Sequence, residues 1–83
     1  MNLWIKLRLD AIVREIEKNE GISVSYTMSD TEVNWCIKVL SKKTGELVTT
    51  YLPVDYKSAT SPDMPQFILS TVKELEELEW TDD

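Results

Sequence analysis

The fold of this chain is decided by residues 33–53, VNWCIKVLSKKTGELVTTYLP. Two runs rich in β-branched and aromatic residues flank a lysine-rich turn that contains Gly45. Such runs, separated by a short turn, predict a β-hairpin, and a glycine supplies the positive φ that a hairpin loop with a bulge needs. The stretch therefore predicts two antiparallel strands, and it carries no catalytic motif.

A third strand is predicted before this hairpin, over residues 22–28, because apolar and hydroxyl residues alternate there. Residues 29–32 then form a turn, so the three strands make an antiparallel meander. The side chains predicted to face the core are Ile22, Val24, Tyr26, Met28, Val33, Trp35, Ile37 and Val39. The last strand, 47–52, is expected to end at Pro53, which cannot donate to a ladder, and 54–60 is expected to be a loop.

Helices are predicted on both sides of the meander. Residues 3–19 carry an apolar face at helical spacing, and Asn19 and Gly21 provide the stop. An alternative makes the first nine residues a strand, with Asp10 capping a shorter helix. The second helix is expected to start with Ser61 as N-cap and Pro62 at its first position, and to run to about Trp80. The two apolar faces are Ile5, Leu9, Ile12, Val13 and Ile16, then Met64, Phe67, Ile68, Val72, Leu75 and Leu78.

The predicted order is therefore α-β-β-β-α. Because both helix faces and one sheet face are apolar, an α+β two-layer sandwich is expected, with a three-stranded antiparallel meander packed against two helices. At 83 residues the whole chain, 1–83, is expected to be a single small acidic domain.

Composition excludes several classes of function. The chain has no histidine and a single cysteine, so it lacks the commonest general base and metal ligand and cannot form an internal disulfide. Neither a membrane-spanning run nor a signal peptide is recognisable, and a cytoplasmic location is expected. Only two glycines are present, too few for a phosphate-binding loop. No cofactor and no metal site are expected.

Charge is divided unevenly along the chain. Of the net charge of −6, residues 1–45 contribute +1 and residues 46–83 contribute −7. Six acids crowd the last ten residues, namely Glu74, Glu76, Glu77, Glu79, Asp82 and Asp83. Such a segment disfavours direct binding to nucleic acid or to a membrane and favours a protein partner with a basic surface.

The candidates for chemistry are weak. Cys36 lies mid-strand without a base to activate it, and an unreactive thiol is expected. The acids of the second helix at i,i+3 spacing are expected to lie on a solvated face, and Lys42 and Lys43 in a solvated turn.

The aromatic residues are more informative than these groups. Trp80 and Leu69 fall off the second helix's apolar stripe, and Leu3, Trp4 and Leu7 fall off the first helix's stripe. A tryptophan beside charged residues has the composition of a binding anchor with a polar rim. Trp80, the six acids, Trp4 and Leu7 are therefore the predicted partner-binding residues, and a homodimer is one use of such a surface.

Residues 37–48, IKVLSKKTGELV, followed by Leu52-Pro53, resemble the hairpin of the flagellar FlaG family. The resemblance covers at most residues 10–53 and implies an assembly protein that associates with itself or with a larger structure. From the residues alone, the expected function is a non-enzymatic protein-binding module. It would be a small acidic regulator or inhibitor that masks a basic nucleic-acid-binding surface, of the phage anti-defence or host-takeover type. The FlaG-like assembly protein is the alternative.

Overall fold

The computed structural model describes residues 3–41 and 43–77. The elements are α1 (Leu3–Ile16), β1 (Ile22–Met28), β2 (Glu32–Leu40), β3 (Leu47–Asp55), α2 (Tyr56–Ala59) and α3 (Met64–Glu77). The strands form one antiparallel sheet in the order β1-β2-β3, with α1 before the sheet and α2 and α3 after it. The α+β class and the three-stranded meander are confirmed, and the short helix α2 is an addition to the predicted order.

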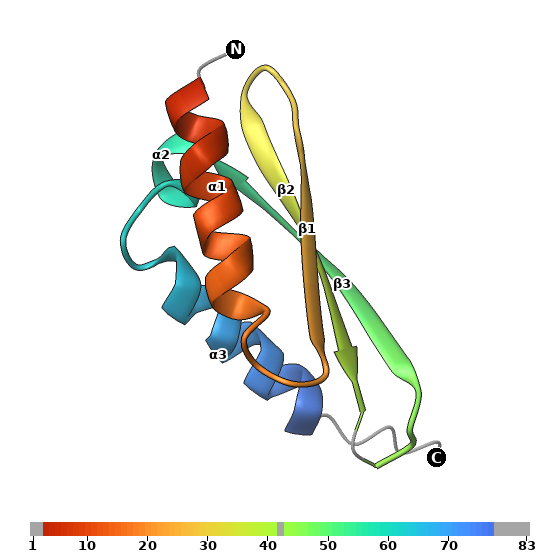
Figure 1. Cartoon of the computed structure of the whole chain (residues 1–83). Coiled ribbons are helices and arrows are strands. Elements are labelled where there is room, and N and C mark those ends of the chain that lie inside the picture. The colour runs from red at the N-terminus through yellow and green to blue at the C-terminus, as the bar shows by residue number, and fades with distance from the viewer. Residues whose placement is uncertain (1–2, 42, 78–83) are drawn as a thin grey trace.

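The molecule has two layers, with α1 and α3 side by side on one face of the sheet (Figure 1). α1 packs on β1, α3 packs on the central strand β2, and α2 closes one end near β2 and β3. No described helix lies on the opposite face of the sheet. The two long helices therefore cover β1 and β2 more closely than β3, which leaves the β3 side of the sheet more open.

The core lies between the helices and the inner face of the sheet. Its buried residues are Leu9, Ile12, Ile16, Val24, Val33, Trp35, Ile37, Val39, Ala59, Met64, Ile68 and Val72. Trp35 is fully buried and meets its cross-strand partner Tyr26 edge to face, with ring centroids 5.6 Å apart. Each fully buried large apolar side chain contributes about 1.5–3 kcal/mol, so the small core depends on a few such residues. The residues of β1 and β2 predicted to face the core are the ones that lie on the inner face of the sheet, so this prediction is confirmed.

The helix predicted at the N-terminus is confirmed over the alternative strand. α1 ends at Ile16, three residues before the predicted end. There the Asn19 side-chain amide donates to the carbonyl oxygen of Ile16 at 3.0 Å, and Gly21 takes a φ of 79° before β1 begins. The Asn19 side chain thus satisfies a carbonyl group at the end of α1 that a further helical turn would otherwise satisfy.

The prediction that Pro53 ends the third strand is wrong. β3 continues to Asp55, and Pro53 is aligned with Asn34 of β2. Proline is tolerated in an edge strand where its missing N–H faces away from the neighbouring strand. The prediction that residues 54–60 form a loop is also wrong. Val54 and Asp55 belong to β3, and α2 follows directly. The Asp55 carboxylate accepts the Ser58 N–H at 3.3 Å and caps that helix.

The predicted start of the last helix is also wrong. Ser61 Oγ accepts the N–H of Asp63 at 3.2 Å, as an N-cap side chain would, but it does so in a turn that precedes the helix, and α3 begins only at Met64. Phe67 N–H donates to the carbonyl oxygen of Asp63 at 3.1 Å, which closes the first full turn. Pro65 fits there because the first turn needs no N–H from it. The predicted end near Trp80 lies outside the described residues, as does Leu78.

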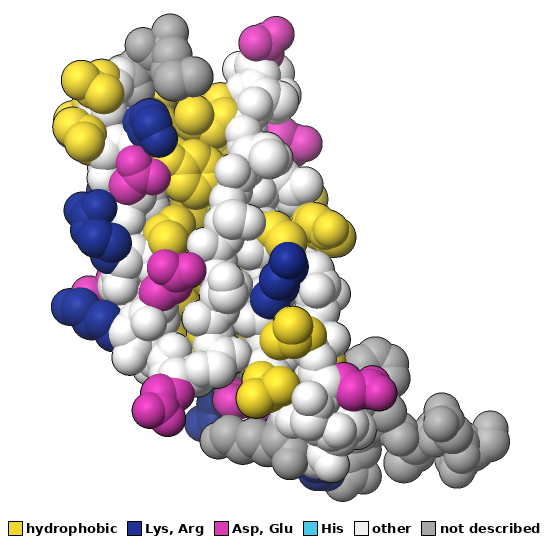
Figure 2. All heavy atoms as spheres, turned by 45° about the vertical axis from the view of Figure 1, so that its right-hand side comes forward, with side chains coloured by type: hydrophobic (Ala, Val, Ile, Leu, Met, Phe, Trp, Pro, Cys, Tyr) yellow, Lys and Arg dark blue, Asp and Glu magenta, His cyan; other side chains and the backbone are white. Residues whose placement is uncertain are grey.

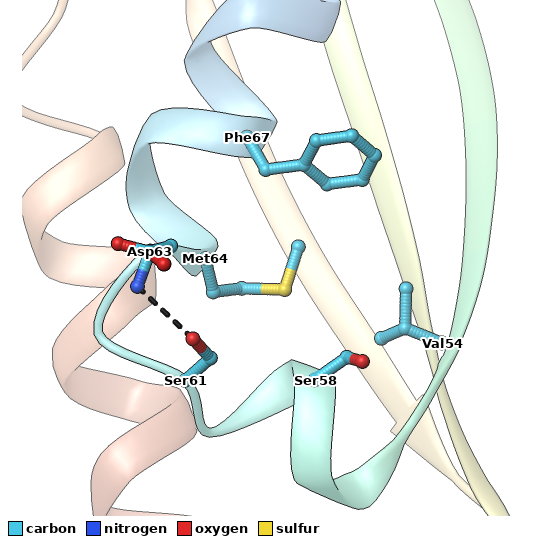
Figure 3. A pocket seen from close by; sticks show the side chains of 6 residues that line it. All are labelled: Val54, Ser58, Ser61, Asp63, Met64 and Phe67. Carbon is cyan, nitrogen blue, oxygen red and sulfur yellow. Dashed lines mark hydrogen bonds between the residues drawn. The ribbon is translucent and has the colours of Figure 1, made fainter.

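Two apolar residues of α3 differ from their predicted environment. Phe67, expected in the buried stripe, is 51 % exposed, whereas Leu69, expected off the stripe, is half-buried against the core. The two side chains lie about 200° apart around a helix. Phe67 is on the flank toward the strands (Figure 3), so Leu69 is on the opposite flank, the side of α1. The sequence could not show which flank α1 would cover.

Candidate protein-binding surface

The clearest exposed apolar surface lies on the first two turns of α1. Leu3, Trp4 and Leu7, here called the α1 tip patch, are 68 %, 62 % and 59 % exposed. The same helix buries Leu9, Ile12 and Ile16 completely, because that face meets the sheet. Hydrophobic side chains are visible at this end of the molecule in Figure 2. The structure thus places Trp4 and Leu7 where the sequence predicted, on an exposed helix flank.

The α1 tip patch stands on a firmly attached helix. Arg8 donates from Nε to the carbonyl oxygen of Thr60 and from a terminal nitrogen to that of Ser61, each at 3.4 Å. These two bonds connect α1 with the segment between α2 and α3. A partner bound at the patch would therefore meet a surface that loses little conformational freedom on binding.

A polar cluster of Lys6, Asp10 and Tyr26 adjoins the patch. The Tyr26 hydroxyl donates to Asp10 Oδ1 at 2.5 Å, and Lys6 Nζ lies 3.4 Å from Asp10 Oδ2 and 3.5 Å from the Tyr26 oxygen. The hydrogen bond from Tyr26 is the main cause that lowers the pKa of Asp10. Desolvation and then the bond to Asp10 raise the pKa of Tyr26. Bonds to Tyr26 and then Asp10 raise the pKa of Lys6.

These three shifts have a chemical consequence. A general acid or base works best when its pKa is close to the working pH. Here the carboxylate, the phenol and the ammonium all shift away from neutrality, so each group holds its ordinary charge at neutral pH. The cluster is therefore suited to holding α1 against β1 rather than to moving protons.

A second surface feature was missed by the sequence reasoning. An open cleft of about 420 Å³ lies between the end of β3, α2 and the start of α3 (Figure 3). Its lining comprises Val54, Ser58, Ser61, Asp63, Met64 and Phe67. In Figure 3 the Phe67 ring and the Met64 side chain point toward the strands above Val54. Phe67 is a core residue by its spacing, so no signal in the sequence distinguishes this cleft from a closed core.

The predicted acidic anchor is described only in part. Glu74 is exposed and Glu76 is half-buried on α3, and Glu77 ends that helix. Glu79, Trp80, Asp82 and Asp83 lie outside the described residues. α1 and α3 run in the same direction in Figure 1, so the end of α3 that carries Glu74 and Glu76 is far from the α1 tip patch. Among the described residues, the two predicted groups therefore do not form one surface.

The remaining candidates show no built site. Cys36 is half-buried on the outer face of β2, aligned with Ser25 on one side and Tyr51 on the other. Within residues 3–41 and 43–77, no three Cys, Asp or Glu side chains converge to hold a metal ion. None of the described helices is both long enough and apolar enough to cross a bilayer.

Comparisons with protein-family models, with curated proteins and with solved structures found no match to this chain. The resemblance to the FlaG family therefore rests on the hairpin residues alone. What the protein does has to be argued from its own surface.

Proposed function

We propose that this chain is a non-enzymatic protein-binding module, a small acidic regulator or inhibitor that docks on a partner protein. The observation that carries the proposal is the α1 tip patch, where three large apolar side chains share one exposed helix end. Tryptophan is enriched at binding hot spots because it contributes a large apolar area at little conformational cost. Trp4 is the natural central anchor, with Leu3 and Leu7 beside it.

The charge of the chain supports a basic partner. A net charge of −6, concentrated in residues 46–83, attracts positively charged proteins and speeds their association at low ionic strength. The chemistry of such a partner is that of a nucleic-acid-binding surface, which this module would mask in the manner of a phage anti-defence or host-takeover protein. The location that goes with this role is the cytoplasm.

The polar chemistry agrees with a binding role. Among the described residues, the groups whose pKa is displaced are Lys6, Asp10 and Tyr26, which hold α1 on β1, and Asp55, whose pKa is lowered first by its bond with Ser58 at the cap of α2. Each displacement is explained by a structural contact. None of these pKa values is displaced toward neutral pH, where a general acid or base works best.

The test is affinity capture from host lysate at low and high salt, read by mass spectrometry, with wild type and two leucine variants. Leu7→Ser removes a member of the tip patch, and Leu40→Ser removes an exposed leucine of the sheet as a matched control. We expect a basic partner that is lost at high salt and with Leu7→Ser but kept with Leu40→Ser. Equal capture by all three proteins would refute a docking role for the tip.

A structural or assembly protein is the second candidate, and the exposed edge of β3 favours it. β3 forms one border of the sheet, and its residues 47–54 carry no charge. Unprotected edge strands of this kind recruit other strands. An assembly role predicts self-association.

A further inference from the structure

The two edges of the sheet are not equivalent. At the β1 edge, the main-chain N–H of Val24 donates to Glu17 Oε2 at 3.4 Å, so a side chain from the end of α1 occupies that edge. At the β3 edge, no described residue donates to or accepts from the outward main-chain groups of 47–53. α1 also packs on β1, whereas neither long helix packs closely on β3.

The ladder pattern shows which groups of β3 are directed outward. Central-strand residues in an antiparallel sheet alternate between their two neighbours. Because Val24 donates to Glu17, its partner Ile37 bonds toward β3, and Thr50 bonds back to Ile37. The residues that alternate with Thr50 therefore face the free edge, namely Leu47, Thr49, Tyr51 and Pro53. The position of Pro53 agrees, since its missing N–H then costs no bond to β2.

The side chains of β3 suit a partner strand that carries no charge. Residues 47–52, LVTTYL, combine β-branched, aromatic and leucine residues without a charged group, the composition of segments that pair readily. Natural edge strands usually carry a lysine, an inward-pointing charge or a proline that prevents such pairing. Between Leu47 and Val54, Pro53 is the one residue of these kinds. Leu47 and Tyr51 are 66 % and 63 % exposed on the outer face.

We propose that β3 pairs antiparallel with β3 of a second copy of this chain, forming one continuous sheet around a two-fold axis near Thr50 and Tyr51. Two copies that each carry −6 repel one another, so they meet most favourably where neither presents charge. The uncharged stretch 47–54 provides such a border. Residues 22–28 of β1 are uncharged as well, but there α1 packs on the strand and Glu17 bonds to the Val24 amide, so β3 is the more accessible edge. An antiparallel edge is also self-complementary, because each strand offers the same outward N–H and C=O groups that it needs from the other.

The same arrangement gives the exposed side of α3 a neighbour. Phe67 and Val54 line the open cleft beside β3, and the inner-face residues of β3 are only half-buried. A second sheet joined at β3 extends the inner face, so these apolar groups would face the equivalent groups of the other copy. Because Glu17 bonds to the Val24 amide and α1 packs on β1, β3 of one copy meets β3 of another rather than β1, and the assembly closes as a dimer instead of growing into a filament.

The proposal does not depend on the α1 tip patch, and its test uses purified protein without a partner. Sedimentation measurements over a range of concentrations should show a reversible dimer. Amide exchange measured by NMR should slow at Thr49 and Tyr51 as the concentration rises, and stay constant at Tyr26 and Met28 of the β1 edge. A chain that stays monomeric throughout, or protection that appears at β1, would overturn the proposal.

A pair of variants tests the edge directly. Thr49→Pro removes one outward N–H from each copy without removing a bond to β2, and Thr49→Val keeps the N–H as the matched control. We expect Thr49→Pro to raise the dimer dissociation constant about tenfold or more, and Thr49→Val to change it little. Equal dissociation constants for the two variants would count against strand pairing. Should Thr49→Pro fail to fold, Thr49→Lys places a charge on each edge and is expected to weaken the dimer similarly.

Discussion

The hydroxyl of Tyr26 in β1 donates a hydrogen bond of 2.5 Å to the carboxylate of Asp10 in α1. The two residues are 16 positions apart, and among the described residues their bond is shorter than the other side-chain hydrogen bonds to β1, those from Lys6 to Tyr26 and from Val24 to Glu17. Tyr26 also meets Trp35 edge to face, so one side chain joins the helix, the strand and the centre of the core.

We expect Tyr26→Phe to lower the free energy of unfolding by about 1 kcal/mol at neutral pH, because the ring packing on Trp35 remains while one hydrogen bond to a charged group is lost. Urea unfolding followed by the tryptophan fluorescence measures this change. The control is Tyr51→Phe, whose hydroxyl lies on the exposed outer face. An equal effect for both variants would show that the bond to Asp10 contributes nothing.

The pH dependence of stability offers a second readout of the same bond. The pKa of Asp10 is lowered from 3.8, so its stabilisation is present above pH 3.8 and is lost as the pH falls through the folded value. The pKa of Tyr26 is raised from 10.0, so its stabilisation is present below pH 10.0 and is lost as the pH rises through the folded value. Tyr26→Phe should flatten both limbs of a plot of unfolding free energy against pH. A wild-type plot with neither limb would contradict this account.

Glu17 is expected to protect the β1 edge through its bond to the Val24 N–H. Glu17→Ala should speed exchange of the Val24 amide and lower the free energy of unfolding by about 1 kcal/mol. The control is Glu15→Ala, which removes another acid near the end of α1 and a surface pair with Lys18 worth less than about 0.5 kcal/mol. Unchanged exchange at Val24 in Glu17→Ala would rule out the protective role.

The hairpin turn should depend on one backbone conformation. Gly45 has a φ of 76°, and a Cβ at this position would meet no atom within 4 Å. Gly45→Ala therefore tests the backbone alone, and we expect it to lower the free energy of unfolding by about 1–2 kcal/mol. Gly45→Asn should lower it less, because asparagine tolerates the left-handed region. Urea midpoints for the three proteins check the order, and an alanine variant as stable as wild type would contradict it.

Some features of the fold could be predicted because they depend on neighbouring residues. The alternation of Val33, Trp35, Ile37 and Val39 fixes which face of β2 is buried, and Gly45 fixes the hairpin turn. Helical spacing placed Leu9, Ile12 and Ile16 in the core and left Leu3, Trp4 and Leu7 exposed. The exposure of the α1 tip patch could therefore be predicted from the sequence, since a side chain off the apolar stripe of an amphipathic helix is exposed.

Other features were decided only when the elements packed together. Pro53 continues β3 because its missing N–H is directed away from β2, and only the register of β3 on β2 decided that direction. Phe67 is exposed and Leu69 half-buried because α1 lies on one flank of α3 and leaves the other open. Burial of a helix flank depends on a neighbour distant in the chain. Periodicity determined the elements and their inward faces, and tertiary packing determined the edges and flanks where this protein can meet another.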